Sequence, residues 1–295
     1  MMIALHAWRS ADSIRRFREV HPDRPLVVAL TGTDINAYLD SDPAPTLRSL
    51  ADADRLVVLQ SLARRRVPAK FRRKVRVIHQ SVPAQRRTTA RSTRHLDVLV
   101  IGHLREVKDP LRAAEAARLL PATSRIRVVH LGAAETSHWA ALAHAEMKSN
   151  PRYVWRGERT RAEVRRRLAC AHAVVLSSLH EGGANVISEA VAAGAPVLAS
   201  RIDGSVGLLG HGYPGYFPVR DTAALARLLH RIESEPEFLL RLRRAIARRA
   251  PLFRPTREKA AWKKLIDELT QRSRAKPRRP AAQLMGRRAR RLTNM

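Results

Sequence analysis

The sequence predicts an α/β protein with parallel sheets in two domains, and three observations support that fold class. Short apolar runs of strand length alternate with amphipathic segments of helix length along most of the chain. The runs are apolar along nearly their whole length, which is typical of parallel strands covered on both faces. The 295 residues are enough for about two domains of ordinary size.

The expected strands fall on either side of a polar, basic stretch at residues 83–95, which is typical of an interdomain linker. Before it, strands are expected at residues 3–6, 26–30, 55–59 and 75–79. After it, they are expected at residues 96–101, 126–131, 153–155, 173–176 and 196–199. Helices are expected between most strands, for example at residues 11–20 and at residues 110–120, which open with a proline as first helical turns allow.

The two expected domains are unequal in length. Residues 1–82 are few for a doubly wound domain and start almost within a strand, so we expect an incomplete first domain. Residues 96–255 supply a complete second domain, and residues 256–271 are expected to form a C-terminal helix. The tail at residues 272–295 has nine basic residues and no acidic one, which predicts a disordered segment.

The chain is strongly basic, with 56 Lys and Arg, 26 Asp and Glu, and a net charge of +30. Such charge is typical of a surface that binds nucleic acid or anionic lipid. The codons of a GC-rich genome explain it better, since only 8 of the basic residues are Lys and the others are Arg. No nucleic-acid recognition motif accompanies the charge, so a nucleic-acid-binding protein is the weaker hypothesis.

Other features of the composition exclude several classes of protein. The single cysteine, Cys170, excludes a disulfide framework and a multi-cysteine zinc site. No apolar stretch approaches the roughly 18 to 20 residues of a membrane-spanning helix, and we expect no signal peptide and a cytoplasmic location. Asp-x-Asp pairs at residues 40–42 and 52–54 are of the kind that holds a divalent ion, but they are frequent by chance, and we expect no metal site.

The most informative stretch follows the expected strand at residues 173–176. The pair Gly182-Gly183 lets a ligand approach the backbone closely, and the helix expected from Asn185 would present free N–H groups to a phosphate. Glu181 and Glu189 can both face the crevice at the carboxyl ends of the strands, where open α/β sheets bind ligands. The alternative is a common loop-to-helix junction with two solvated carboxylates.

A second glycine loop follows the expected strand at residues 96–101. Gly102 precedes Arg105 and Lys108, whose positive charges could stabilise a phosphate group. The alternative is an ordinary solvated loop.

Together these strings resemble the signature of GT-B fold glycosyltransferases of the glycosyltransferase 4 type. The matching residues are Glu181-Gly182-Gly183, Glu189-Ala190 and Gly194-Ala195-Pro196-Val197. The resemblance implies two Rossmann-like domains that face a cleft. It also implies a UDP-sugar donor that is bound with no metal and no other cofactor.

The resemblance further implies a role for each donor-site residue. Arg105 and Lys108, on the loop that follows Gly102, would bind the diphosphate, and Glu189 would bind the ribose. The donor sugar would be contacted by Glu181, Gly182, Gly183, Ala184 and Asn185. His103 stands where similar enzymes usually have an arginine, so Arg105 is expected to replace it.

The N-terminal strings resemble the selenosugar synthases of selenoneine biosynthesis. The matching strings are His6-Ala7-x-Arg9-Ser10-Ala11-Asp12-Ser13, Leu30-Thr31-Gly32-Thr33-Asp34, Ala53-Asp54-Arg55-Leu56-Val57-Val58-Leu59-Gln60 and Ile78-His79-Gln80-Ser81. The resemblance implies transfer of the sugar to selenium, which is delivered as the anion selenophosphate. Such enzymes usually carry a further strand and loop ahead of residues 3–6, so we expect an N-terminally shortened member.

On the acceptor side we expect His6, Thr31, Thr33 and Asp34, which follow two neighbouring strands. The alternatives are a helix N-cap at Thr33 and Asp34 and a histidine satisfied by backbone groups. Two other functions stay open for the whole chain. One is a UDP-sugar-dependent hexosyltransferase with an oxygen acceptor, and the other is a truncated, inactive homologue that only binds UDP.

Overall fold

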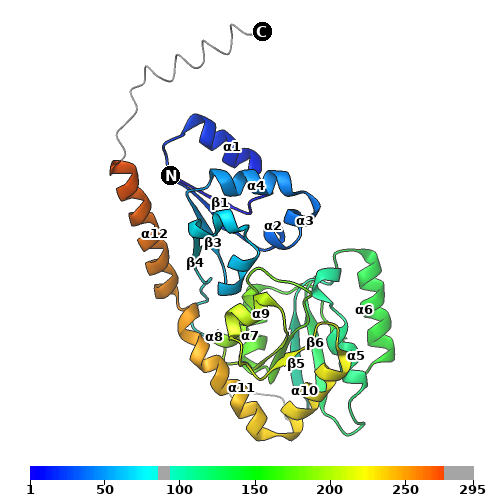
Figure 1. Ribbon diagram of the computed structural model, residues 1–295. Helices are drawn as coiled ribbons and strands as arrows, with labels where there is room; N and C mark the ends of the chain where they lie inside the picture. The colour runs from blue at the N-terminus through cyan, green and yellow to red at the C-terminus, as the bar shows by residue number, and fades with distance from the viewer. Residues whose placement is uncertain (86–93, 276–295) are drawn as a thin grey trace.

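The computed structural model describes residues 1–85 and 94–275. Most of the linker expected at residues 83–95 and most of the tail expected at residues 272–295 lie outside the described residues. Within them the chain forms two parallel β-sheets with helices packed against both, so the predicted fold class is confirmed (Figure 1). No helix of the described residues is long and apolar enough to cross a membrane.

The first sheet has four parallel strands in the order β1-β2-β3-β4. These strands are β1 (Met2–Leu5), β2 (Leu26–Leu30), β3 (Arg55–Val58) and β4 (Val75–Val77). The connections contain the helices α1 (Ala11–Val20), α2 (Thr33–Asn36), α3 (Tyr38–Ser41), α4 (Pro43–Asp52), η1 (Ser61–Arg65) and η2 (Ala69–Lys74). The register pairs Leu5 with Ala29 and Ala29 with Val57, so the loops after β1, β2 and β3 leave the sheet at one level.

The two faces of this sheet are covered by helices from opposite ends of the chain. Because side chains alternate along a strand, each strand contributes to both faces. One face packs against Ile14 of α1 and Leu50 of α4. The other packs against the C-terminal helix α12 (Pro255–Ala275), which runs back along the first sheet (Figure 1) and buries Leu265 and Leu269 on it.

The second sheet has six parallel strands in the order β10-β9-β8-β5-β6-β7. These strands are β5 (Leu96–Ile101), β6 (Ile126–Leu131), β7 (Tyr153–Trp155), β8 (Ala173–Leu176), β9 (Val197–Ser200) and β10 (Tyr216–Phe217). The strand order reverses between β5 and β8. That reversal opens a crevice at the carboxyl ends of these two strands, which is the usual ligand position in such sheets.

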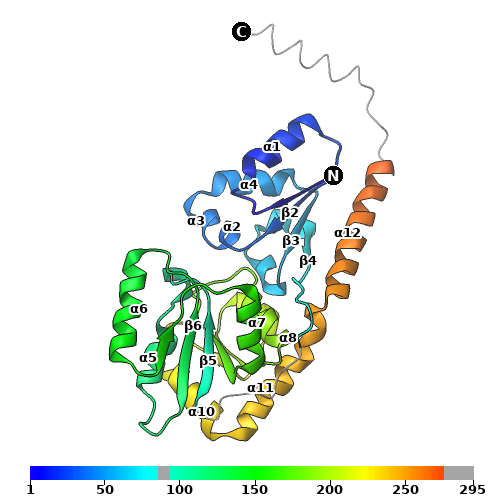
Figure 2. The same ribbon diagram turned by 180° about the vertical axis from the view of Figure 1, so that it is seen from behind.

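Helices lie on both sides of the second sheet (Figure 2), as expected for strands buried on both faces. They are η3 (Glu106–Lys108), α5 (Arg112–Arg118), α6 (Ser137–Ser149), α7 (Arg161–Cys170), α8 (Asn185–Ala192), α9 (Asp203–Leu209), α10 (Thr222–Ser234), α11 (Pro236–Arg249) and η4 (Ala250–Phe253). Helix α5 buries four alanines, whose small side chains let it lie close to its neighbours.

Several element ends differ from the expectation by one to four residues, and one short strand was not expected. Strand β4 ends at Val77, two residues earlier than expected, and β10 is too short for an apolar pattern to reveal it. Helix α5 starts at Arg112 because Asp109 adopts a left-handed backbone with φ 45°, which leaves Pro110 in a turn ahead of the helix.

Candidate functional site

A cavity of about 240 Å³ lies between the two halves, and we call it the central cavity. Its walls come from loops that follow the carboxyl ends of β1, β2, β5 and β8. The lining residues are His6, Arg9, Thr31, Gly32, Thr33, Arg105, Val107, Lys108, His180, Glu181 and Gly182. The structure therefore brings predicted donor-side and acceptor-side residues together in one place.

Lys108 and Glu181 form an ion pair in the central cavity. The Oε1 atom of Glu181 also accepts a hydrogen bond of 2.7 Å from the Ser178 hydroxyl. The two charged side chains are only 22% and 13% exposed, so solvent screens their attraction less than at an open surface. Both bonds fall on Oε1, which leaves the lone pairs of Oε2 for a hydroxyl group of a ligand.

The loop that carries Lys108 is held in place by the residue that follows the neighbouring strand β8. The hydroxyl of Ser177, directly after β8, donates to the carbonyl oxygens of Lys108 at 3.0 Å and Asp109 at 2.8 Å. The carboxylate of Asp109 accepts two hydrogen bonds from the guanidinium of Arg112. These contacts hold the left-handed turn at Asp109, and the turn sets the direction of Lys108.

Arg105 has a different environment from Lys108. Its Nε atom is buried, and it has no hydrogen-bond partner among the described residues. An unpaired buried donor is costly unless a ligand satisfies it. His103 is exposed, does not line the central cavity, and accepts a hydrogen bond of 3.2 Å from the Ala133 N–H. The geometry thus favours Arg105 over His103 as the cation of this loop.

Gly102 is held in place by a buried histidine that the sequence does not single out. Nε2 of His130 donates to the Gly102 carbonyl oxygen at 3.0 Å, and its Nδ1 atom lies 3.0 Å from the Tyr153 hydroxyl. Burial lowers the pKa of His130 to about 4, so the ring is neutral near pH 7. The carbonyl can only accept, and this fixes the proton of the neutral ring on Nε2.

The glycines after β2 and β8 bring the two halves into backbone contact. Gly32 has φ +128°, a conformation that favours glycine. A Cβ atom on Gly182 would lie 2.4 Å from the Gly32 Cα atom and 2.5 Å from the Thr31 carbonyl oxygen. One residue further, a Cβ atom on Gly183 would lie 2.5 Å from the Leu59 Cβ atom. No larger residue fits between these loops at their present separation.

On the acceptor side, both ring nitrogens of His6 are used within the protein. Nε2 lies 2.9 Å from the Thr33 hydroxyl oxygen, and Nδ1 accepts a hydrogen bond of 3.1 Å from the Arg9 N–H. Burial lowers the pKa of His6, the charge of Asp34 opposes the shift, and the charge of Arg9 adds to it. The neutral ring therefore links the loop after β1 to the loop after β2.

Asp34 is fully buried and does not line the central cavity. Its carboxylate accepts hydrogen bonds from four backbone N–H groups, those of Ala7, Thr31, Gly32 and Ile35. This arrangement organises the two acceptor-side loops instead of presenting the carboxylate to a ligand.

Four predicted donor-site residues do not line the central cavity: Gly183, Ala184, Asn185 and Glu189. Glu189 is the fifth residue of α8, and its carboxylate has no hydrogen bond to a described residue. Burial raises its pKa, and the charges of Arg161 and Arg165 oppose that shift. Gly102 also lies outside the lining, but its position next to the Lys108 side chain places it at the same loop.

Sequence reasoning missed three residues that line the central cavity, namely Arg9, Val107 and His180. Arg9 belongs to the matching string around His6, yet no role was predicted for it. His180 directly precedes Glu181. Burial lowers the pKa of His180, the charge of Glu181 opposes this shift, and the charges of Lys108 and Arg105 add to it. Membership of that string was the signal for Arg9, and adjacency to Lys108 and Glu181 was the signal for Val107 and His180.

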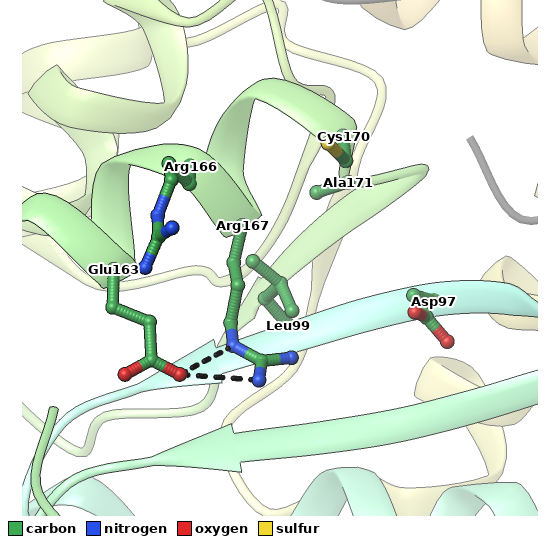
Figure 3. Close-up of a pocket in the computed structure, with 7 residues that line it drawn as sticks. All are labelled: Asp97, Leu99, Glu163, Arg166, Arg167, Cys170 and Ala171. Atoms are coloured by element: carbon green, nitrogen blue, oxygen red, sulfur yellow. Dashed lines mark hydrogen bonds and ion pairs between the residues drawn. The ribbon is translucent and has the colours of Figure 1, made fainter. Parts of the chain in front are cut away.

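A second hollow of about 350 Å³ lies between α7 and β5 (Figure 3). Its walls carry an ion pair of Glu163 with Arg167 at 3.2 Å and the half-buried Cys170. None of the predicted site residues lines it. Among residues 1–85 and 94–275, no group of three or more His, Cys, Asp or Glu side chains is placed to hold a metal ion.

Solved structures share this fold. HepE from Anabaena, in complex with UDP and glucose, superposes with a TM-score of 0.75 at 16% identity, over 91% of this chain and 77% of that chain. Sucrose-phosphate synthase from Thermosynechococcus elongatus gives 0.75 at 16% identity, over 91% and 73% of the two chains. An α,α-trehalose-phosphate synthase (UDP-forming) from Burkholderia vietnamiensis gives 0.74 at 12% identity, over 92% and 72%.

The match by sequence covers more than half of the chain. Residues 81–250 fit the family described as Glycosyl transferases group 1, and a search of curated proteins gives no significant match. The matched range includes the loops that supply Arg105, Lys108, Glu181 and Glu189. This protein is therefore a glycosyltransferase of the GT-B fold and belongs to the glycosyl transferases group 1 family.

Proposed function

We propose that this glycosyltransferase moves a sugar from a UDP-sugar to selenium supplied as selenophosphate. The observation that carries the proposal is the central cavity, where Arg105 and Lys108 face His6 and Thr33 across the two halves. In this proposal residues 1–82 form the acceptor side and residues 96–255 form the donor side. HepE was solved with UDP and with UDP-glucose, which supports a UDP-sugar donor. The selenium acceptor rests on the resemblance of the N-terminal strings.

Each charged residue predicted on the donor side has a role in this proposal. Arg105 and Lys108 neutralise the diphosphate, so the reaction requires no metal ion. Glu181 accepts a hydrogen bond from a hydroxyl of the donor sugar through Oε2, and Ser178 keeps the carboxylate in place. Glu189 accepts one from the ribose.

The reaction exchanges one bond to the anomeric carbon for another. A lone pair of the selenophosphate selenium forms the bond to C1 while the C1–O bond breaks and its electron pair leaves with UDP, so the immediate product keeps the Se–P bond and carries selenium between C1 and phosphorus. A selenium anion needs little help from a base, so the protein must chiefly stabilise the leaving diphosphate. The close approach of the loops at Gly32 and Gly182 would keep out water, which would otherwise hydrolyse the donor.

The test is mass spectrometry of a reaction that contains the protein, UDP-N-acetylglucosamine and selenophosphate. We expect UDP and a selenium-containing sugar, and we expect both to disappear in Glu181→Ala and Lys108→Ala. Lys259→Ala, which removes the same charge from the exposed side of α12, should retain both products. UDP release with the sugar on an oxygen acceptor would show a hexosyltransferase instead, and UDP binding without turnover would show an inactive homologue. A cytoplasmic location and the lack of a nucleic-acid partner stay predictions.

A further inference from the structure

We propose that Arg9 holds the anionic group of the acceptor, so that the central cavity selects a tetrahedral oxyanion such as a phosphate-type group. This inference rests on the proposed function, because it assumes that the acceptor enters between the two halves. It adds a binding residue that the sequence pattern did not reveal.

Arg9 is the charged residue on the acceptor side of the central cavity, and its guanidinium is available to a ligand. Five residues of the N-terminal half line the central cavity: His6, Arg9, Thr31, Gly32 and Thr33. His6 and Thr33 bond to each other, and Asp34 behind them is saturated by backbone N–H groups. In the part of the chain that the structure describes, no carboxylate forms an ion pair with the Arg9 guanidinium.

The backbone that carries Arg9 is fixed on several sides. The Arg9 N–H donates to the His6 ring, and the Ser10 N–H donates to the His6 carbonyl oxygen at 3.1 Å. The Ser10 hydroxyl closes the turn with a bond of 2.6 Å to the Leu5 carbonyl oxygen. His6 itself has φ 70°, a left-handed conformation that is uncommon for a residue with a side chain and that clusters at functional sites.

The charges around the central cavity are not balanced within the protein. Lys108 is matched by Glu181, whereas Arg105 and Arg9 have no acidic partner among the described residues. They come from opposite halves, so one guanidinium can serve the donor diphosphate and the other a second anion. A guanidinium binds phosphate-type oxygens in a bidentate manner, which a neutral hydroxyl acceptor cannot reproduce.

The experiment measures binding of inorganic phosphate by calorimetry to the full chain saturated with UDP, at constant ionic strength. UDP occupies the donor site, so the phosphate reports the acceptor site. We expect Arg9→Gln to weaken phosphate binding by about tenfold or more, as for a lost charged hydrogen bond, and Arg9→Lys to weaken it less. UDP affinity should stay within twofold of the wild type. Arg16→Gln, which removes an exposed arginine of α1, should change neither affinity.

Three results would overturn the inference. They are a wild-type protein that does not bind phosphate, an Arg9→Gln variant that binds phosphate as the wild type does, and an equal loss of UDP and phosphate affinity in a folded variant. Thermal denaturation of each variant shows whether it is folded. A failure of the proposed function has a different readout, because selenophosphate then gives no selenosugar while the phosphate titration still measures the contribution of Arg9.

Discussion

Replacing Gly182 with alanine forces apart the two loops that close the central cavity. The new Cβ atom would lie 2.4 Å from the Gly32 Cα atom, whereas ordinary contact starts at 3.4 Å, so the loops must separate by about 1 Å. Gly182 has no positive φ, so alanine can adopt its backbone conformation and the clash is the only direct effect. Overpacking of this kind costs about 1–3 kcal/mol. Because the loops must touch for activity in this proposal, the same cost would be added to the activation free energy and would lower kcat/KM by about 5- to 150-fold.

The assay is UDP release from UDP-N-acetylglucosamine in the presence of selenophosphate, together with thermal denaturation. Gly212→Ala is the matched control, because a Cβ atom there meets no atom within 4 Å and no positive φ is involved. We expect the control to retain wild-type rates. Gly182→Ala with wild-type kcat/KM and stability would refute the conclusion that these loops must touch for activity.

Three further predictions concern residues that do not line the central cavity. Asp34→Asn replaces an acceptor of four N–H groups by an amide and should lower the free energy of unfolding by about 2 kcal/mol in urea denaturation. Leu265→Ala should lower it by about 2–4 kcal/mol, whereas the exposed Leu119→Ala should change it little. Because burial raises the pKa of Glu189, its protonated fraction grows at higher pH than for a free glutamate. The UDP affinity of the wild type should therefore fall on acidification at a higher pH than a free glutamate would cause. In Glu189→Gln this pH-dependent loss should be absent.

The sequence predicts the layers of the fold well because periodicity is a local property. Helix α1 and strand β5 agree with expectation to the residue, since each is a clear run between polar segments. The start of α5 was wrong because the left-handed turn at Asp109 depends on Arg112 and on Ser177, which lies far away along the chain. Strand β10 has two residues and owes its existence to pairing with β9.

The site residues could be predicted where one loop carries both a glycine and a charged residue, as with Gly102 and Lys108 or Gly182 and Glu181. Contacts between segments that are distant in the sequence leave no local pattern from which to predict them. The backbones of Gly32 and Gly182 approach each other although they are 150 residues apart. The side chains of His6 and Thr33 are bonded to each other, which leaves the Arg9 side chain available to a ligand. Glu181 and Glu189 share a motif, yet only Glu181 lines the central cavity, because α8 carries Glu189 away from the loop.

The most direct test of the account is a calorimetric titration of UDP into the wild type and into Arg105→Ala, Lys108→Ala and the control Lys259→Ala. We expect the wild type and the control to bind UDP equally well. We expect each of the other two variants to bind UDP at least about tenfold more weakly, because each loses a charged contact to the diphosphate. Equal UDP affinity in all four proteins, or no binding by the wild type, would contradict the assignment of the donor site to this cavity.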